Sequence, residues 1–219
     1  MKVAVIGSTG YVGAHLVKEL VDRNYEVVAL ARHIDNIPSN DNITKVQVDI
    51  NNHEQLVEAL KGVDVVISAF NAGWANPNLY EDFTKGALAI QQAVKDAGTK
   101  RLIVVGGAGS LLIDGNRLVD SPDFPQEIKP GALAAADYLD TIRKENQLDW
   151  TMISPAIEMN PHAGGTRTGN YRTGLDAPVF DQEGRSKLSV EDLAVAIVDE
   201  IENKQFINKR FTHSNRRIT

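Results

Sequence analysis

Three glycines near the start of the chain, Gly7, Gly10 and Gly13, have the spacing of a phosphate-binding loop. They follow an apolar run that ends at Ile6, and a segment with helical apolar spacing comes next. Glycine lets backbone N–H groups approach a pyrophosphate, and the start of a helix adds partial positive charge. We therefore expect a dinucleotide-binding turn, the alternative being a plain glycine turn. The expected cofactor contacts here are Gly7, Ser8, Thr9, Gly10, Tyr11, Val12 and Gly13.

Arg32 bears on the choice of cofactor. It follows the apolar run Val27–Leu30, at the place where an NAD enzyme of this kind usually has an acidic residue. Because a guanidinium suits a 2′-phosphate, NADP(H) is favoured over NAD(H). Two alternatives stay open: Arg32 is a solvated arginine at a strand end, or the nearby Asp35 makes NAD(H) the cofactor.

Further cofactor contacts are expected where later strands end. Asp49 would border the adenine, unless it begins the cap of the next helix. Small residues after the fourth and fifth strands would let the ribose and the nicotinamide approach the backbone, although such residues also suit a turn. The expected contacts are Asp49, Ile50, Ser68, Ala69, Phe70, Gly106 and Gly107.

The segments that must position these residues alternate between short apolar runs, typical of buried strands, and apolar residues at helical spacing. Short β-branched runs predict buried parallel strands at 3–6, 27–30, 43–48, 63–69, 102–105 and 151–154. Helical spacing lies between them, with starts like capping boxes at Asn52 and Ser189 and with helices at about 79–97 and 131–147. The alternation predicts an α/β fold of the Rossmann type, a doubly wound parallel sheet with helices on both faces. Ligands of such sheets bind beyond the carboxyl ends of the strands.

The length and composition fit one domain, because the chain has 219 residues and 42% of them are hydrophobic. We expect residues 1–155 to form the dinucleotide-binding core, and residues 156–219 to form a small lid and a terminal helix. The loops 114–130 and 155–187 both follow strands, so they should overhang the same edge of the sheet and build the lid.

Charge and composition exclude several partners. The net charge is −6 and the basic residues are scattered, so neither nucleic acid nor an anionic membrane is expected as a partner. The chain has no cysteine, and its histidines lack metal-ligand spacing, so no metal site is expected. The missing thiols, the start of the chain and the lack of long apolar stretches indicate a cytoplasmic protein.

Several segments resemble atypical short-chain dehydrogenases/reductases, in particular the NADH-flavin reductase-like and NmrA-like NAD(P)-binding groups. Besides the glycine loop, these segments are Ser154–Ala156, Arg167–Arg172, 183–186 and 189–194. The resemblance covers nearly the whole chain. It implies cofactor contacts at Pro155 and Ala156, and a substrate contact at a serine after the fifth strand, for which Ser110 is the candidate.

The usual catalytic pair of this superfamily is missing. In that pair, a lysine four residues after a tyrosine lowers the phenol pKa. Tyr138 lies on the expected helix, but Ile142 stands where the lysine would be, and the other tyrosines also lack it. An unaided tyrosine is a poor acid–base catalyst at neutral pH. A flavin or quinone can instead take hydride into a stabilised anion that solvent protonates, so this chemistry does not need the pair.

The candidates for substrate-side chemistry each have a structural alternative. Ser110 is either a substrate contact or a turn hydroxyl, and Tyr138 either acts on the substrate or packs in its helix. His162 is a candidate proton donor in the lid. The remaining candidates, which could hold a flavin phosphate or cover a ring but could equally be solvated or packed, are Trp74, Arg167, Tyr171 and Arg172.

Together these features predict an NAD(P)H-dependent oxidoreductase that passes hydride to a flavin, quinone or similar conjugated acceptor. FMN and FAD are candidate substrates, and a homodimer is a candidate assembly. One alternative is a non-catalytic, NmrA-like redox sensor that only binds dinucleotide. Another is an epimerase, dehydratase or carbonyl reductase with a replacement acid, such as His162 or Tyr138.

Overall fold

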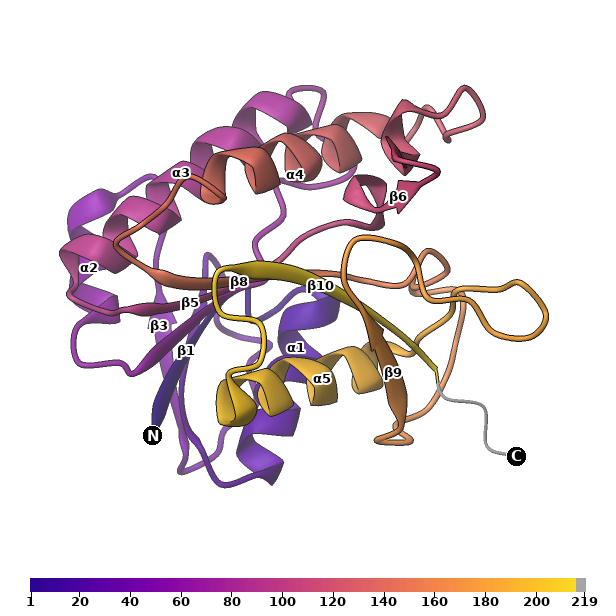
Figure 1. Cartoon of the computed structure of the whole chain (residues 1–219). Coiled ribbons are helices and arrows are strands. Elements are labelled where there is room, and N and C mark those ends of the chain that lie inside the picture. Colours follow the sequence, from indigo (N-terminus) through magenta and orange to yellow (C-terminus); the bar gives the residue numbers. More distant parts are fainter. Residues whose placement is uncertain (216–219) are drawn as a thin grey trace.

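The computed structural model describes residues 1–215 and arranges them around an eight-stranded sheet (Figure 1). The strand order is β3-β2-β1-β4-β5-β8-β10-β9, and all neighbours pair in parallel except β9, which is antiparallel to β10. The order reverses between β1 and β4, the switch point at which doubly wound sheets bind ligands. The strands are β1 (Lys2–Ile6), β2 (Glu26–Ala31), β3 (Ile43–Gln47), β4 (Val65–Ser68), β5 (Arg101–Val105), β8 (Asp149–Ser154), β9 (Tyr171–Gly174) and β10 (Lys209–Asn215).

Helices cover both faces of the sheet, as the alternating pattern predicts (Figure 1). One face is covered by α1 (Tyr11–Asp22) and α5 (Val190–Asn203), and the other by α2 (His53–Leu60), α3 (Leu79–Asp96) and α4 (Lys129–Ile142). The predicted Rossmann-type fold is therefore confirmed. Within residues 1–215, none of the helices has the length and apolar character needed to cross a membrane.

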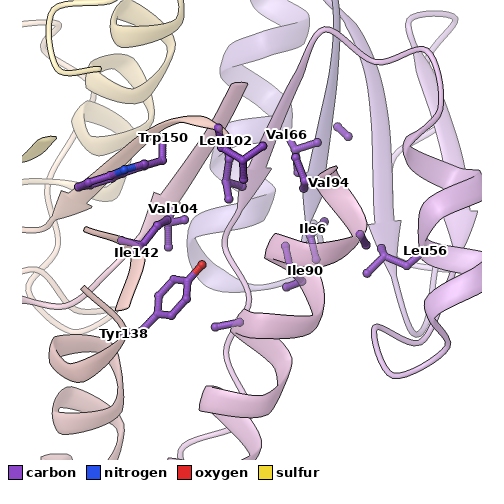
Figure 2. Packing of buried hydrophobic residues seen from close by; sticks show 14 of the residues in the cluster. Ile6, Leu56, Val66, Ile90, Val94, Leu102, Val104, Tyr138, Ile142 and Trp150 are labelled. Carbon is purple, nitrogen blue, oxygen red and sulfur yellow. The ribbon is translucent and has the colours of Figure 1, made fainter. Parts of the chain in front are cut away.

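Each central strand supplies side chains to two cores, one on each face. On β4, Val66 packs against the α2–α3–α4 side, whereas Val65 and Ile67 pack against the α1–α5 side. Figure 2 shows the first of these cores, with Leu102 of β5 facing the helices. A strand covered on both faces must be apolar throughout, which is why these strands appear in the sequence as continuous apolar runs.

Local capping signals fix the ends of several helices. Asn52 accepts a hydrogen bond from the Gln55 N–H at 3.2 Å, and Ser189 accepts one from the Asp192 N–H at 3.1 Å. Both predicted N-caps are therefore confirmed. Gly98 has a φ of +80° just beyond the end of α3, the left-handed conformation in which glycine commonly ends a helix.

The helix predicted at 131–147 begins earlier and is shorter. It starts at Lys129, with Pro130 in its first turn, and ends at Ile142. Proline is favoured at the first positions of a helix because its fixed φ suits them. Beyond Ile142 the Glu145 carboxylate accepts a hydrogen bond from the Gln147 N–H at 2.7 Å. Such a local bond competes with a further helical turn.

The chain beyond residue 155 adds strands to the main sheet, whereas the sequence predicts only a lid and a terminal helix there. β10 pairs with β8, and β9 forms the edge. β10 contains Arg210, Thr212 and His213, which are polar yet buried, so this run lacks the apolar signature of a central strand. The last residues of the expected C-terminal region, 216–219, lie outside the described part of the chain.

Glu200 fastens α5 to the end of the sheet opposite the switch point. Its carboxylate lies 2.7 Å from the Arg101 guanidinium and accepts hydrogen bonds from the N–H groups of Gln205 and Phe206 at 3.0 and 3.1 Å. Arg101 and Glu200 are both buried. Burial lowers the pKa of Arg101, and the Glu200 carboxylate opposes this effect. The buried cation therefore depends on Glu200.

Replacing Glu200 with alanine leaves the Arg101 charge buried without its carboxylate. We expect the free energy of unfolding to fall by about 3–5 kcal/mol, measured by urea denaturation. The control Glu58→Ala breaks an exposed ion pair with Lys61 and should cost less than about 1 kcal/mol. Equal losses in the two variants would contradict the role given to Glu200.

Candidate functional site

The glycine loop is packed so closely that two of its positions have no room for a side chain. A methyl group on Gly13 would lie 2.0 Å from the Gly7 carbonyl oxygen, and one on Gly7 would lie 2.7 Å from the Ala69 carbonyl oxygen. Gly7 also has a φ of +80°, which other residues rarely adopt. These contacts hold the start of α1 against the carboxyl ends of β1 and β4, at the switch point of the sheet.

Three hydrogen bonds fasten the loop to β2. The N–H groups of Gly7 and Ser8 donate to the Leu30 carbonyl oxygen at 3.0 and 3.1 Å, and the Ser8 hydroxyl donates to the same oxygen at 3.0 Å. Ser8 is buried, whereas Thr9 and Gly10 are exposed. Ser8 therefore holds the loop in place, and Thr9 and Gly10 form its open side.

The first turn of α1 has the character of an anion site. Its N-cap residue is Gly10, which has no side chain to accept hydrogen bonds from the first N–H groups of the helix. The first turn contains no acidic residue. α5 differs, because Ser189 caps it and Glu191 and Asp192 lie in its first turn. A helix start with partial positive charge, next to a loop that excludes side chains, suits a pyrophosphate. The geometry therefore fits a dinucleotide.

Arg32 and Asp49 follow neighbouring strands but differ in their contacts. Arg32 lies just beyond β2 and is exposed. The Asp49 carboxylate accepts hydrogen bonds from the Asn51 N–H and side-chain amide at 2.9 and 3.0 Å. These bonds lower the pKa of Asp49, with a smaller effect from the Arg32 charge. Asp49 thus supports the turn before α2, whose N-cap is Asn52, and the Arg32 side chain faces solvent.

The residues after β4 point mainly into the core. The Phe70 and Phe83 rings stack with centroids 5.9 Å apart. A methyl group on Gly86 of α3 would lie 2.5 Å from the Phe70 ring and 2.7 Å from Ile50, so these two side chains pack under the helix. Ser68 is buried and lines a cavity of about 10 Å³, which has room for one water. A cofactor contact at Phe70 would therefore come from its backbone.

The loops after β5 and β8 lie side by side, because these strands are neighbours. The Gly106 N–H donates to the Ile153 carbonyl oxygen at 2.8 Å, and a methyl group on Gly106 would lie 2.9 Å from a methionine sulfur. Gly107 has more room, since its nearest neighbour would lie at 3.6 Å. Pro155 and Ala156 are buried just after β8.

Ser110 is held inside a polar cluster and is 3% exposed, which argues against a free substrate-binding hydroxyl. Its oxygen lies 3.1 Å from the Gly107 carbonyl, 3.0 Å from the Ser154 hydroxyl and 3.1 Å from the Arg210 guanidinium. Arg210 also pairs at 2.6 Å with Asp176, in the segment between β9 and α5. We call Ser110, Ser154, Asp176 and Arg210 the Arg210 cluster. It ties the loop after β5 to β8, to β10 and to the segment between β9 and α5.

Tyr138 lies in the core, where α4 packs on the sheet and α3 (Figure 2). It is 3% exposed, and its hydroxyl donates to Gln91 of α3 at 3.0 Å. Gln91 is fixed in turn by Glu145 at 2.6 Å. Burial raises the pKa of Tyr138. The phenol is therefore neutral and enclosed in the core.

Residues 166–174, called the strap below, lie along α1 and α5. The Nε and Nη2 groups of Arg167 donate to the two oxygens of the Glu19 carboxylate, at 2.8 and 2.9 Å. The hydroxyl and N–H of Thr168 donate to Asp192 at 2.6 and 2.8 Å. Hydrogen bonds from Arg167 lower the pKa of Glu19, whose carboxylate is otherwise disfavoured by burial.

Arg23, just after α1, closes these contacts into a ring. It donates to Glu19 at 2.8 Å and to Asp199 at 2.7 Å, and the Tyr171 hydroxyl donates to Asp199 at 2.5 Å. Arg172 donates to the Phe180 carbonyl oxygen at 2.8 Å. The strap side chains that the sequence offers as flavin ligands are thus used to fasten the strap. They are Arg167, Tyr171 and Arg172.

His162 is exposed and lines an open cavity of about 570 Å³ formed mainly by the segment between β8 and α5. The cavity also has Lys187 in its lining, together with an Arg185–Glu158 ion pair. Of the three catalytic candidates, His162 therefore meets solvent, whereas Ser110 and Tyr138 are buried.

Trp74 lies on the loop after β4 and is 60% exposed. A methyl group on Gly131, in the first turn of α4, would lie 2.9 Å from the indole and 2.9 Å from Leu79. Glycine at this position is what lets the indole lie so close to the helix.

The sequence analysis misses the acidic and basic partners that hold these residues. Ser154, Asp176 and Arg210 of the Arg210 cluster, and Glu19 and Asp192 under the strap, belong to segments far from the residues they contact. The sequence offers no local signal for them, because Arg210 is recognised as a buried charge that requires partners only once its strand has been placed.

Comparisons with known proteins agree with this geometry. The model of the NAD(P)H-binding family matches residues 7–204. The chain is 35% identical over 215 residues to the uncharacterised protein YwnB of Bacillus subtilis (strain 168), with 97% of each chain covered. A solved structure from Bacteroides thetaiotaomicron, provisionally named an epimerase, has a TM-score of 0.90 and 40% identity, with 100% of this chain and 98% of that chain covered.

A second solved structure, from Streptococcus pneumoniae TIGR4, is provisionally named an NADH-flavin reductase. Its TM-score is 0.87 at 37% identity, with 99% of this chain and 100% of that chain covered. The resemblance to atypical short-chain dehydrogenases/reductases is confirmed by these relatives. The chain therefore belongs to the NAD(P)H-binding family, and a nicotinamide dinucleotide suits the geometry of its glycine loop.

Proposed function

We propose that the chain is an NAD(P)H-dependent reductase that passes hydride to a small conjugated acceptor, a flavin or a quinone, and that it prefers NADP(H) to NAD(H). The observation that supports this most is the burial of Tyr138, which bonds to Gln91 in the core. Ile142 stands where the partner lysine would be. Among the described residues, the usual tyrosine–lysine pair is therefore absent, and acceptors that need a proton from it are disfavoured.

Reduction of a conjugated acceptor does not require a proton donor from the chain. When bound, a reduced nicotinamide supplies hydride, so that NAD(P)H, the acceptor and one proton from water give NAD(P)⁺ and the two-electron-reduced acceptor. The chain has to bind the dinucleotide and bring two rings into contact. The open first turn of α1 suits the pyrophosphate, and the loops after β4, β5 and β8 border the ring-binding edge.

A second candidate function follows from the relative of Bacteroides thetaiotaomicron, which is provisionally named an epimerase. An epimerase or carbonyl reductase needs a group that exchanges protons with the substrate. His162 is the exposed candidate for this role. The two functions therefore differ in their dependence on His162.

Oxidation of NADPH by the purified protein tests the reductase. We expect addition of FMN, FAD or a naphthoquinone to raise the oxidation rate well above the protein-free rate. His162→Gln should leave this rate within about twofold, because water supplies the proton. Tight NADPH binding without acceptor-dependent oxidation would contradict the proposal and identify a redox sensor. A loss of about a hundredfold in His162→Gln would instead favour a reaction with a protein acid.

Reversing the charge of Arg32 tests the cofactor preference. In Arg32→Glu we expect the Kd of NADPH to rise about 10- to 100-fold, because a charge-assisted bond to the 2′-phosphate is lost and repulsion replaces it. The Kd of NADH should change by less than about threefold, since NADH lacks this phosphate. Lys61→Glu, at an exposed site after α2, makes the same change in net charge and serves as the control. Calorimetry measures both constants, and an unchanged NADPH Kd would refute the role of Arg32.

Tyr138→Phe separates packing from catalysis. It removes the hydroxyl that bonds to Gln91, so we expect the free energy of unfolding to fall by about 1 kcal/mol. Because the phenol lies in the core, kcat for acceptor reduction should stay within about twofold of wild type. A fall in kcat of about a hundredfold or more, with the fold intact by circular dichroism, would show that Tyr138 takes part in proton transfer.

A further inference from the structure

We propose that Trp74 is the surface on which the acceptor stacks, so that a flat conjugated ring lies between this indole and the nicotinamide. This inference rests on the proposed reductase function and names the residue that selects the acceptor.

The indole of Trp74 combines exposure with a fixed position. Trp74 is 60% exposed, whereas Trp150 is 2% exposed. Large aromatic side chains are usually well buried, so an exposed indole held in place is uncommon. One edge of the indole lies against Gly131, where a methyl group would come within 2.9 Å. Glycine within a helix lowers its stability, and here it makes room for the indole.

Side-chain bonds on both sides of Trp74 fix its loop. The Asn71 side chain accepts a hydrogen bond from the Gly73 N–H at 2.7 Å. The Asn76 side-chain amide donates to the Ala72 carbonyl at 3.2 Å and to Asp82 of α3 at 2.8 Å. A loop that is already ordered loses less conformational entropy when a ligand binds. The indole is thus presented in a preformed position.

The position of the loop places Trp74 beside the expected nicotinamide half of the dinucleotide. The loop follows β4 at the carboxyl edge, next to the switch point, while Arg32 follows β2 on the other side of β1. The first turn of α4, which holds the indole, also touches the loop after β5, because a methyl group on Gly109 would lie 3.0 Å from Ala132. A dinucleotide spans the switch point, so its two ends lie on opposite sides of it.

The chemistry of an indole defines the class of acceptor. Its face is apolar and favours offset stacking with another π-system. Flavins and quinones share the required property, a flat conjugated ring that accepts hydride, whereas a sugar or an aliphatic carbonyl compound offers no such face. Stacking on one aromatic side chain typically changes affinity by about 10-fold or more.

Tryptophan fluorescence tests this site without turnover. The full chain saturated with NADP⁺ is titrated with FMN, and in a parallel arm with a soluble naphthoquinone, with correction for light absorbed by the acceptor. We expect saturable quenching of the Trp74 component, obtained as the difference between wild type and Trp74→Phe. In Trp74→Leu the KM for the acceptor should rise about 10-fold, while the NADPH Kd changes by less than about twofold. Trp74→Phe keeps a ring and should raise the KM by less than about threefold.

Gly131→Ala provides an independent variant, because it displaces the indole yet favours the helix. It should raise the acceptor KM in the same direction as Trp74→Leu, and the exposed Leu88→Ala should leave both constants unchanged. The inference is overturned if neither acceptor gives saturable quenching, or if Trp74→Leu leaves the acceptor KM within about twofold of wild type. Saturable quenching without NADPH oxidation supports the stacking site and overturns the proposed reductase. The arm that saturates identifies the acceptor as flavin or quinone.

Discussion

The contact between Gly13 and Gly7 is the constraint on which the carboxyl edge of the molecule depends. A side chain at Gly13 would begin 2.0 Å from the Gly7 carbonyl oxygen, so α1 can start this close to β1 only with glycine there. The position of α1 then determines where Glu19 and Arg23 lie. Glu19 and Arg23, on and just after this helix, bind the strap and α5. The loop that suits a pyrophosphate and the contacts that hold the strap therefore share one helix.

Two buried arginines fix the ends of β10, the strand that the sequence does not predict. Arg101 pairs with Glu200, which accepts hydrogen bonds from the turn before β10. Arg210, on β10 itself, bonds to Ser110 and Asp176. Burial lowers the pKa of both arginines, and in each case a carboxylate opposes the effect. Each cation is costly to bury alone, so its partners are constrained with it. The Arg210 cluster thereby fixes the loop after β5 relative to β8 and to the segment between β9 and α5.

How much the sequence predicts depends on the range of the interactions involved. Three features depend on residues within a few positions of one another, and all three were predictable. They are the glycine loop, the caps at Asn52 and Ser189, and the apolar strands. The strap was not, because Arg167 contacts Glu19, 148 positions earlier. Ser110 likewise acquires its partner Arg210 from 100 positions later. Tyr138 has an ambiguous pattern, since a tyrosine on an amphipathic helix packs equally well inward or at a cleft. Its burial is decided by the meeting of α4 with α3, a tertiary contact that no local pattern encodes.

The contacts of the polar side chains are consistent with a reductase that positions rings and leaves proton transfer to water. Ser110, Tyr138 and Arg167 are engaged by other side chains of the chain, and each of these bonds stabilises a loop or a helix contact. The open features at the carboxyl edge are of another kind: an uncapped helix start, an exposed guanidinium and an exposed indole. These suit phosphates and flat rings. With such a set, discrimination among acceptors would come from shape, stacking and reduction potential rather than from the strength of a protein acid. A site of this kind favours a group of related conjugated acceptors over a single substrate, because stacking distinguishes flat rings from other compounds more sharply than it distinguishes one flat ring from the next.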